Sequence, residues 1–171
     1  ERDVDAMSPQ EIVQAVQDTG LVGLGGAAFP THVKLSPPKG HSVHTVIING
    51  CECEPFLTTD HRVMLEQTDD LILGTRILMK ALGAKNAIIG TEDNKPDAVE
   101  ALKAKLPEDG SISVEMVRTK YPQGAEKMMA KSLLGVEIPS GGYPSSVGLA
   151  VFNVSSTAQL GSLLPQSRGV I

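Results

Sequence analysis

Residues 45–55 read TVIINGCECEP, and this run indicates the fold class. Its first five residues, 45–49, carry three successive aliphatic side chains, which predicts a strand buried on both faces. The remainder is polar, so the chain leaves the strand in a loop. Because ligands in open α/β sheets bind beyond the carboxyl ends of the strands, this loop is a candidate binding segment.

Segments on both sides of this run alternate between strand and helix patterns. Further strands are predicted at 87–90, Ile112–Val117 and 149–154. Helices are predicted from Pro9 to a stop at Gly20, from about Thr59, over 69–82, over 96–106, after Gly124 and over 157–164. The expected caps are Ser8 for the first helix, Asn94 for the helix over 96–106, and Ser155 or Ser156 for the last helix. Such alternation predicts an α/β fold, a Rossmann-like three-layer domain with a mostly parallel sheet, and the length suits one domain over residues 1–171.

Composition and charge narrow the class of partner. Twenty acidic and 15 basic residues give a net charge of −5, which argues against nucleic acid, because phosphate binding depends on a basic surface. No signal peptide is recognisable and no apolar run reaches about 18 residues, so a membrane span is not expected. Two cysteines do not make a secreted disulfide framework and favour a reducing, cytoplasmic setting. The abrupt ends predict that the chain is part of a longer protein.

A glycine-rich loop over residues 20–31 reads GLVGLGGAAFPT. Gly23, Gly25 and Ala28 fit the pattern G-x-G-x-x-G/A. A helix is predicted before the loop, however, where a dinucleotide-binding fingerprint requires a strand, so that motif is rejected. What remains is a run of backbone amides that can approach a phosphate or a flat ring closely, with Lys34 just beyond its end. The alternative is a surface turn without a ligand.

The polar loop after residues 45–49 places carboxylates beside thiols. Asn49 offers an amide, Glu52 and Glu54 offer carboxylates, and Cys51 and Cys53 offer thiols. A metal site is not expected, because C-x-C is tighter than the usual C-x-x-C spacing and the sequence has no further cysteine. An iron–sulfur cluster needs about four cysteines, and a disulfide across one residue would be strained. Buried thiols are the simpler interpretation, and the scattered histidines form no recognisable hydrolase triad.

Four loops in chain order resemble the flavin-carrying, NADH-oxidising subunit of respiratory complex I. The glycine loop with Lys34 is similar to that family's G-x-G-G-A-x-F-P-T…K segment, and residues 49–55 resemble its N-x-x-E-x-E-P loop. Residues 121–126 (YPQGAE) resemble its Y-x-x-G-E-E, and residues 152–154 (FNV) resemble its N-N-V. Three stretches are more specifically similar to the C subunit of the Rnf electron-transport complex: residues 22–30, 52–55 and 138–144. The resemblance covers nearly the whole chain.

This resemblance implies that FMN binds, with NADH stacked on the flavin. By this resemblance, Gly23, Gly25 and Gly26 lie along the flavin ring, and Lys34 lies at the phosphate or the ring edge. Asn49 and Glu52 hold the isoalloxazine and the ribityl chain, and Gly124 and Glu126 form the opposite wall. Asn153 and Ser156 meet the phosphate. A helix start suits a phosphate because free amides and the helix dipole favour an anion. It assigns two residues to NADH, Phe29 by stacking and Glu54 through the ribose or amide. No side chain is implied as catalytic, because the flavin itself transfers the hydride. By its position alone, Glu126 would only complement a helix dipole.

The implied function is that of an electron-transport subunit. It would pass hydride and electrons between NADH and the ferredoxin-side iron–sulfur centres of an ion-translocating Rnf complex. The [4Fe-4S] clusters would lie in a later segment, because their ligand cysteines are not in this sequence. The expected partners are the other Rnf subunits, which would hold the protein peripherally on the cytoplasmic face of the membrane.

Four substitutions depart from the complex I pattern: Leu24 replaces an Arg, Cys51 an Asp, Ala125 a Glu and Phe152 an Asn. Fewer acids would reduce repulsion of a negative nucleotide, whereas lost hydrogen bonds would weaken FMN binding. Two alternatives therefore stay open. One is a related soluble flavoprotein reductase linked to cobalamin or to an amino-acid reductase, and the other is a non-catalytic docking module that has lost its flavin.

Overall fold

The computed structural model describes residues 2–52, 54 and 56–170, and its framework is a parallel sheet. The described strands are β1 (Thr45–Gly50), β2 (Asn86–Glu92), β3 (Ile112–Val117) and β4 (Leu149–Asn153). They lie in the order β3-β2-β1-β4, and every neighbouring pair is parallel. Asn49 of β1 is paired with Asn153 of β4, so the carboxyl ends of these two strands are level. The predicted α/β fold with a mostly parallel sheet is confirmed.

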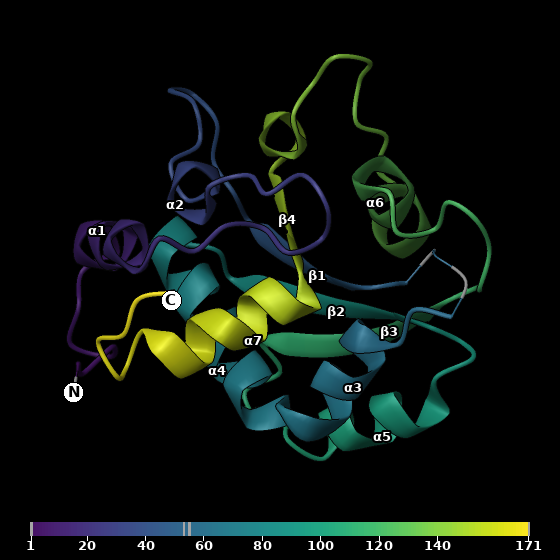
Figure 1. Cartoon of the computed structure of the whole chain (residues 1–171). Coiled ribbons are helices and arrows are strands. Elements are labelled where there is room, and N and C mark those ends of the chain that lie inside the picture. The colour runs from purple at the N-terminus through teal and green to yellow at the C-terminus, as the bar shows by residue number, and fades with distance from the viewer. Residues whose placement is uncertain (1, 53, 55, 171) are drawn as a thin grey trace.

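Helices cover both faces of the sheet and complete three layers (Figure 1). The larger group comprises α3 (Thr59–Glu66), α4 (Thr68–Leu82), α5 (Pro96–Lys103) and α7 (Val154–Leu163), with α1 (Pro9–Thr19) packed against α4. On the other face lie α6 (Glu126–Leu134) and the 3₁₀ helix η1 (Pro144–Val147). The short helix α2 (Thr31–Lys34) follows the glycine loop. The alternating strands and helices of the sequence therefore become the three layers that it predicts.

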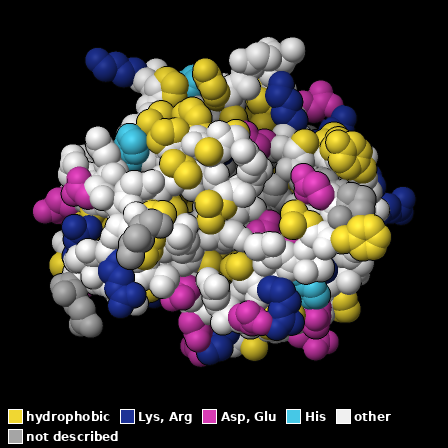
Figure 2. All heavy atoms as spheres, viewed as in Figure 1, with side chains coloured by type: hydrophobic (Ala, Val, Ile, Leu, Met, Phe, Trp, Pro, Cys, Tyr) yellow, Lys and Arg dark blue, Asp and Glu magenta, His cyan; other side chains and the backbone are white. Residues whose placement is uncertain are grey.

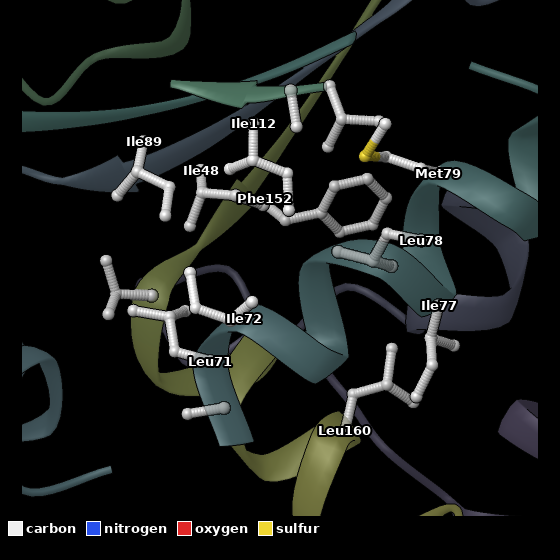
Figure 3. Packing of buried hydrophobic residues seen from close by; sticks show 14 of the residues in the cluster. Ile48, Leu71, Ile72, Ile77, Leu78, Met79, Ile89, Ile112, Phe152 and Leu160 are labelled. Atoms are coloured by element: carbon white, nitrogen blue, oxygen red, sulfur yellow. The ribbon is translucent and has the colours of Figure 1, made fainter. Parts of the chain in front are cut away.

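Successive residues of β1 point to opposite faces and build two separate apolar cores. Val46 and Ile48 belong to the larger core, and Ile47 belongs to the smaller one beneath α6. Figure 3 shows sheet side chains such as Ile48 and Phe152 opposite residues of α4 and α7. Because aromatic residues make up only 3% of the chain, aliphatic side chains fill most of both cores.

Two glycines let α4 and α7 touch backbone to backbone. A Cβ atom on Gly74 would lie 1.9 Å from the carbonyl oxygen of Thr157, and one on Gly161 would lie 1.9 Å from the carbonyl oxygen of Asp70. No side chain fits at either position. The crossing fixes α7 against α4, and therefore fixes the start of α7 at the carboxyl edge of the sheet.

The helix caps differ from the sequence prediction at two of three places. The Ser8 capping box is confirmed, since the Ser8 amide donates to Glu11 Oε2 at 2.7 Å and the Glu11 amide donates to Ser8 Oγ at 3.3 Å. For the last helix the prediction is wrong, because Asn153 is the cap and α7 begins at once with Val154. For α5 the cap position belongs to Lys95 without a side-chain cap, and the helix ends at Lys103 instead of 106. The Asn94 side chain accepts a hydrogen bond from Lys95 Nζ and so does not cap α5.

Both ends of the described chain lie on the same side of the molecule as the C-terminal end of α7 (Figure 1). The Arg2 amide donates to the Pro165 carbonyl at 2.7 Å, and the Val170 amide donates to the Thr19 carbonyl at 2.8 Å. On the face seen in Figure 2, Lys and Arg side chains are scattered among Asp and Glu. Within the described residues, no helix is long and apolar enough to cross a membrane.

Candidate functional site

A cavity of about 140 Å³ lies at the carboxyl ends of β1 and β4. Strands β2 and β3 extend the sheet from one side of β1, whereas β4 adds to the other side. The gap between β1 and β4 is thus the point where the strand order reverses, which is where open α/β sheets bind ligands. The position of the cavity follows from the topology.

The cavity brings together most of the predicted site residues. Those that line it are Gly23, Gly25, Phe29, Lys34, Asn49, Gly124, Glu126, Asn153 and Ser156. Ala27, Ala28, Thr31, Val151 and Phe152 also line it. These five had no predicted role, although their positions in the glycine loop and β4 are the signal that could have found them. Gly26, Glu52 and Glu54 were predicted for the site but do not line the cavity.

The glycine loop folds back on itself and forms one wall. The Gly23 amide donates to the Phe29 carbonyl at 2.8 Å, and Val22 forms an antiparallel bridge with Pro30. A Cβ atom on Gly25 would lie 3.1 Å from the Asn153 Cβ, closer than ordinary side-chain contact allows. The loop therefore presents bare backbone to the cavity, as close approach by a flat or phosphorylated ligand requires.

Lys34 contributes a positive charge to the lining of the cavity. Its Nζ lies 2.6 Å from Glu126 Oε1 and donates to the Val151 carbonyl at 2.8 Å. The same atom lies 5.6 Å from the centre of the Phe152 ring. Both side chains of the ion pair are partly exposed, so the pair is accessible to a ligand that competes for either charge.

Asn49 joins the end of β1 to the loop before α6. Its Nδ2 donates to the Gly124 carbonyl at 2.8 Å, and its Oδ1 accepts from the Cys51 amide at 3.0 Å. The two walls of the cavity that come from β1 and from residues 121–126 are therefore held at a fixed separation.

An acid that the sequence analysis missed lies at the start of α7. Asn153 Oδ1 accepts from the amides of Ser155 and Ser156 at 2.9 and 3.2 Å. Its Nδ2 donates to Asp60 Oδ2 at 2.7 Å, and Ser155 Oγ donates to Asp60 Oδ1 at 2.5 Å. Ser156 Oγ accepts from the Leu24 amide at 2.7 Å. The polar groups at this helix start are thus already paired within the protein. The only sequence signal for Asp60 is an acid in a predicted first turn.

The carboxylate of Glu52 points toward α3 and not toward the cavity. It accepts from the Asp60 amide at 2.8 Å and from the His61 amide at 3.2 Å, so it caps α3 from outside the helix. His61 Nε2 lies 2.9 Å from Asp97 Oδ1, and this hydrogen bond is the main cause that lowers the pKa of Asp97 below its usual value. Glu54 is exposed beyond the end of β1.

The thiols of the C-x-C segment can be followed only in part. Cys51 is buried, and its Sγ lies 3.5 Å from Met129 Sδ in the smaller core. Cys53 lies outside the described residues. Among the residues that the structure describes, no group of three or more His, Cys, Asp and Glu side chains is placed to hold a metal ion.

The residues of the cavity fit a flat anionic cofactor better than a metal or a neutral ligand. Bare backbone at Gly23 and Gly25 provides a surface for a ring. Lys34 provides a cation, and Asn49 and Asn153 provide amides next to the strand ends. Glu126 lines the cavity, and Asp60 is hydrogen-bonded to Asn153, which also lines it, so a ligand's phosphate would have to bind where Lys34 and the backbone amides outweigh these two acids.

Comparison with known proteins gives relatives over nearly the whole chain. The chain is 45% identical over 157 residues to the C subunit of the Na(+)-translocating ferredoxin:NAD(+) oxidoreductase complex of Acetobacterium woodii, a match that covers 92% of this chain and 35% of that protein. It is 49% identical over 150 residues to the C subunit of the proton-translocating ferredoxin:NAD(+) oxidoreductase complex of Clostridium ljungdahlii, covering 88% and 33%. The chain thus spans about a third of the length of these curated relatives.

A solved structure and a family model agree with these relatives. The fold matches a crystal structure of NAD+-reducing [NiFe]-hydrogenase in the air-oxidized state with a TM-score of 0.82 and 24% identity, over 94% of this chain and 33% of that one. The family model described as the Nuo51 FMN-binding domain matches residues 16–162. Because that match spans most of the chain, the protein belongs to the Nuo51 FMN-binding domain family.

Proposed function

We propose that the chain binds FMN in the cavity between β1 and β4 and exchanges hydride with NAD(H) there. The observation that carries this proposal is the close packing of the bare Gly25 backbone on Asn153, in the same cavity as the Lys34 cation. The family model supports FMN as the cofactor.

The flavin would be held mainly by backbone and by a few polar side chains. Gly23, Gly25 and Gly26 would lie along it, and Lys34 would meet its phosphate or ring edge. Asn49, Glu52, Gly124, Glu126, Asn153 and Ser156 would complete the site. Glu52 is expected to act through its backbone and through its hold on α3, because its carboxylate is already paired with two amides.

The nicotinamide nucleotide would approach from the open side of the cavity. Phe29 is 45% exposed at the cavity wall, which leaves a ring face for stacking. Glu54, exposed beyond β1, would receive a ribose or amide hydrogen bond. When bound, the flavin supplies the hydride chemistry, and the chain supplies binding, orientation and electrostatics.

In the cell we propose that the chain acts within an ion-translocating Rnf complex as part of an NADH/ferredoxin oxidoreductase. Two relatives bear the name of a subunit of a ferredoxin:NAD(+) oxidoreductase complex. Other Rnf subunits would hold it peripherally on the cytoplasmic face of the membrane. Electrons would continue to [4Fe-4S] clusters in a segment that follows this one in the full-length protein.

The direct experiment is a titration of the purified chain with FMN, followed by flavin fluorescence. Quenched fluorescence and retention of flavin on gel filtration are expected. Addition of NADH without oxygen should then bleach the absorption band of the oxidised flavin. Binding without bleaching would restrict the function to flavin binding without hydride exchange, and no binding by this chain or by the full-length protein would refute the proposal.

A docking module without flavin is the second candidate. It is favoured by Asp60, whose carboxylate already occupies the start of α7, where a phosphate was expected. A folded, monodisperse chain that ignores both FMN and NADH, alone and within the full-length protein, would support this second candidate.

A further inference from the structure

A buried ion pair lies at the carboxyl end of β2, outside the cavity. Lys95 Nζ lies 2.5 Å from Glu92 Oε2 and 3.2 Å from Asn94 Oδ1. The side chains of Glu92 and Lys95 are only 3% and 9% exposed. Removing two ions from water is unfavourable, and an apolar pair of similar volume is often at least as stable. Stability alone therefore does not account for these charges.

The Glu92 carboxylate also holds the backbone of the neighbouring strand end. Its Oε2 accepts from the Glu52 amide at 3.2 Å, directly after β1. The carboxylate of Glu52 accepts in turn from the amides of Asp60 and His61. The ion pair is thus the buried end of a chain of hydrogen bonds that sets where the polypeptide leaves β1.

The segment that leaves β1 has a backbone conformation that needs support. We call its described residues the acidic loop: Cys51, Glu52, Glu54, Phe56 and Leu57. Phe56 has φ 67°, in the left-handed region that bulky residues rarely adopt, and its side chain is fully exposed. Such a conformation persists only when its surroundings hold it. The Glu92–Glu52 hydrogen bond anchors the backbone four residues before Phe56.

We propose that Glu92, neutralised by Lys95, is a positioning residue that holds the acidic loop ready for the nicotinamide nucleotide. The proposal rests on the proposed function, because it assigns Glu54 to that nucleotide. Glu92 does not line the cavity, so it acts through the acidic loop, which carries Glu52 on the proposed flavin side and Glu54 on the proposed nucleotide side.

Two double variants separate positioning from packing. Glu92→Gln with Lys95→Met removes both charges but keeps an oxygen that can accept from the Glu52 amide. Glu92→Leu with Lys95→Met removes both charges and the acceptor. Neither variant leaves a buried ion unpaired. Lys131→Met with Glu137→Gln, at an exposed ion pair of 2.7 Å, is the matched control.

Hydrogen exchange and ligand binding are measured on all three variants. The Leu/Met variant should exchange the amides of Glu52, Asp60 and His61 faster and raise the dissociation constant for NADH about tenfold, as loss of one anchoring hydrogen bond implies. Its FMN dissociation constant should rise by less than its NADH dissociation constant, because the flavin contacts other than Glu52 do not depend on Glu92. The Gln/Met variant and the control should resemble the unsubstituted chain in every measurement.

Equal exchange and equal NADH affinity in the two double variants would overturn the proposal. The exchange measurement needs no ligand, so it decides the positioning role even if the chain fails to bind FMN. Failure of the proposed function is therefore distinguishable from failure of this inference. If the Leu/Met variant does not fold, Glu92→Met with Lys95→Met replaces it, because methionine adapts to irregular space.

Discussion

The Lys34 ammonium is held by groups from two other parts of the chain, the Glu126 carboxylate and the Val151 carbonyl. Its charge therefore already serves the protein before any ligand arrives. A bound anion has to compete with Glu126 or share Lys34 with it. This competition makes the residue a sensitive test of whether the cavity binds a phosphorylated ligand.

Lys34→Met should weaken FMN binding by about tenfold or more, because a charge-assisted hydrogen bond to the ligand is lost. Flavin fluorescence titration measures the change. Lys131→Met, which breaks the exposed ion pair between Lys131 of α6 and Glu137 beyond the end of that helix, is the control and should leave FMN affinity unchanged. Equal FMN affinities for the unsubstituted chain and both variants would mean that Lys34 does not touch the flavin.

The resemblance of the loops to a family singled out most of the residues that gather at the cavity, but not where each side chain points. Gly25, Lys34 and Asn49 line the cavity as expected. The Glu52 carboxylate turns to α3, because two unpaired helix amides lie within its reach. Its partner Asp60 follows it in sequence by only eight residues, yet the sequence pattern gave no sign of this contact. Orientation depends on which tertiary partner is nearest, and local patterns do not carry that information.

At the scale of the secondary-structure elements, the backbones of α4 and α7 approach each other closely where they cross at Gly74 and Gly161. Gly161→Ala should lower the free energy of unfolding by about 3 kcal/mol or more, because the new Cβ would overlap the Asp70 carbonyl and force the helices apart. Urea unfolding measures the loss. Gly169→Ala is the matched control, since its Cβ would meet the Thr19 carbonyl oxygen at an ordinary 3.5 Å. An equal effect of both substitutions would contradict the close crossing.

The capping box of α1 predicts a dependence on pH. Hydrogen bonds from the Ser8 amide and then its hydroxyl lower the pKa of Glu11 below its usual value. A lowered carboxyl pKa stabilises the fold above the unfolded-state pKa, and this contribution is lost as the pH falls through the folded-state pKa. The Glu11→Gln variant should therefore have a lower free energy of unfolding than the unsubstituted protein at neutral pH. In strong acid the two free energies should be equal. Urea unfolding at several pH values tests this, with the exposed Glu108→Gln as control. A constant difference across pH would disprove the assignment to charge.

Helix and strand segments were predicted well where periodicity is strong, and poorly at their ends. The Ser8 box was recognisable because both partners lie within one turn of sequence. At α7 three residues that can cap a helix, Asn153, Ser155 and Ser156, lie within four positions, and the strand register decides among them. Asn153 is paired with Asn49, so β4 ends there and leaves its side chain to cap.

For the whole molecule, alternation of elements predicted a parallel sheet but not its strand order. The crossover that places β4 beside β1 brings Asn153 next to Asn49 and creates the cavity. No local pattern encodes this crossover; only the resemblance to a family implied that residues about a hundred positions apart share one ligand.

Binding of FMN should stabilise the whole domain. At a hundredfold excess over the dissociation constant, the free energy of unfolding should rise by about 2.7 kcal/mol, because only the folded chain offers the assembled site. Thermal unfolding with increasing FMN measures this. Riboflavin, which lacks the phosphate, should stabilise less. A midpoint independent of FMN concentration would argue against a flavin site.

The pairing of Arg2 with Pro165 and of Thr19 with Val170 has a practical consequence. Helix α7 begins at the cavity and ends next to Pro165, so its 10 residues separate Arg2 from the start of the helix by about 15 Å. A purification tag, a fluorescent label or a surface tether joined before Arg2 would emerge near the far end of α7. The chain can therefore be immobilised through its N-terminal end on an electrode or a sensor chip while the cavity stays accessible to small molecules.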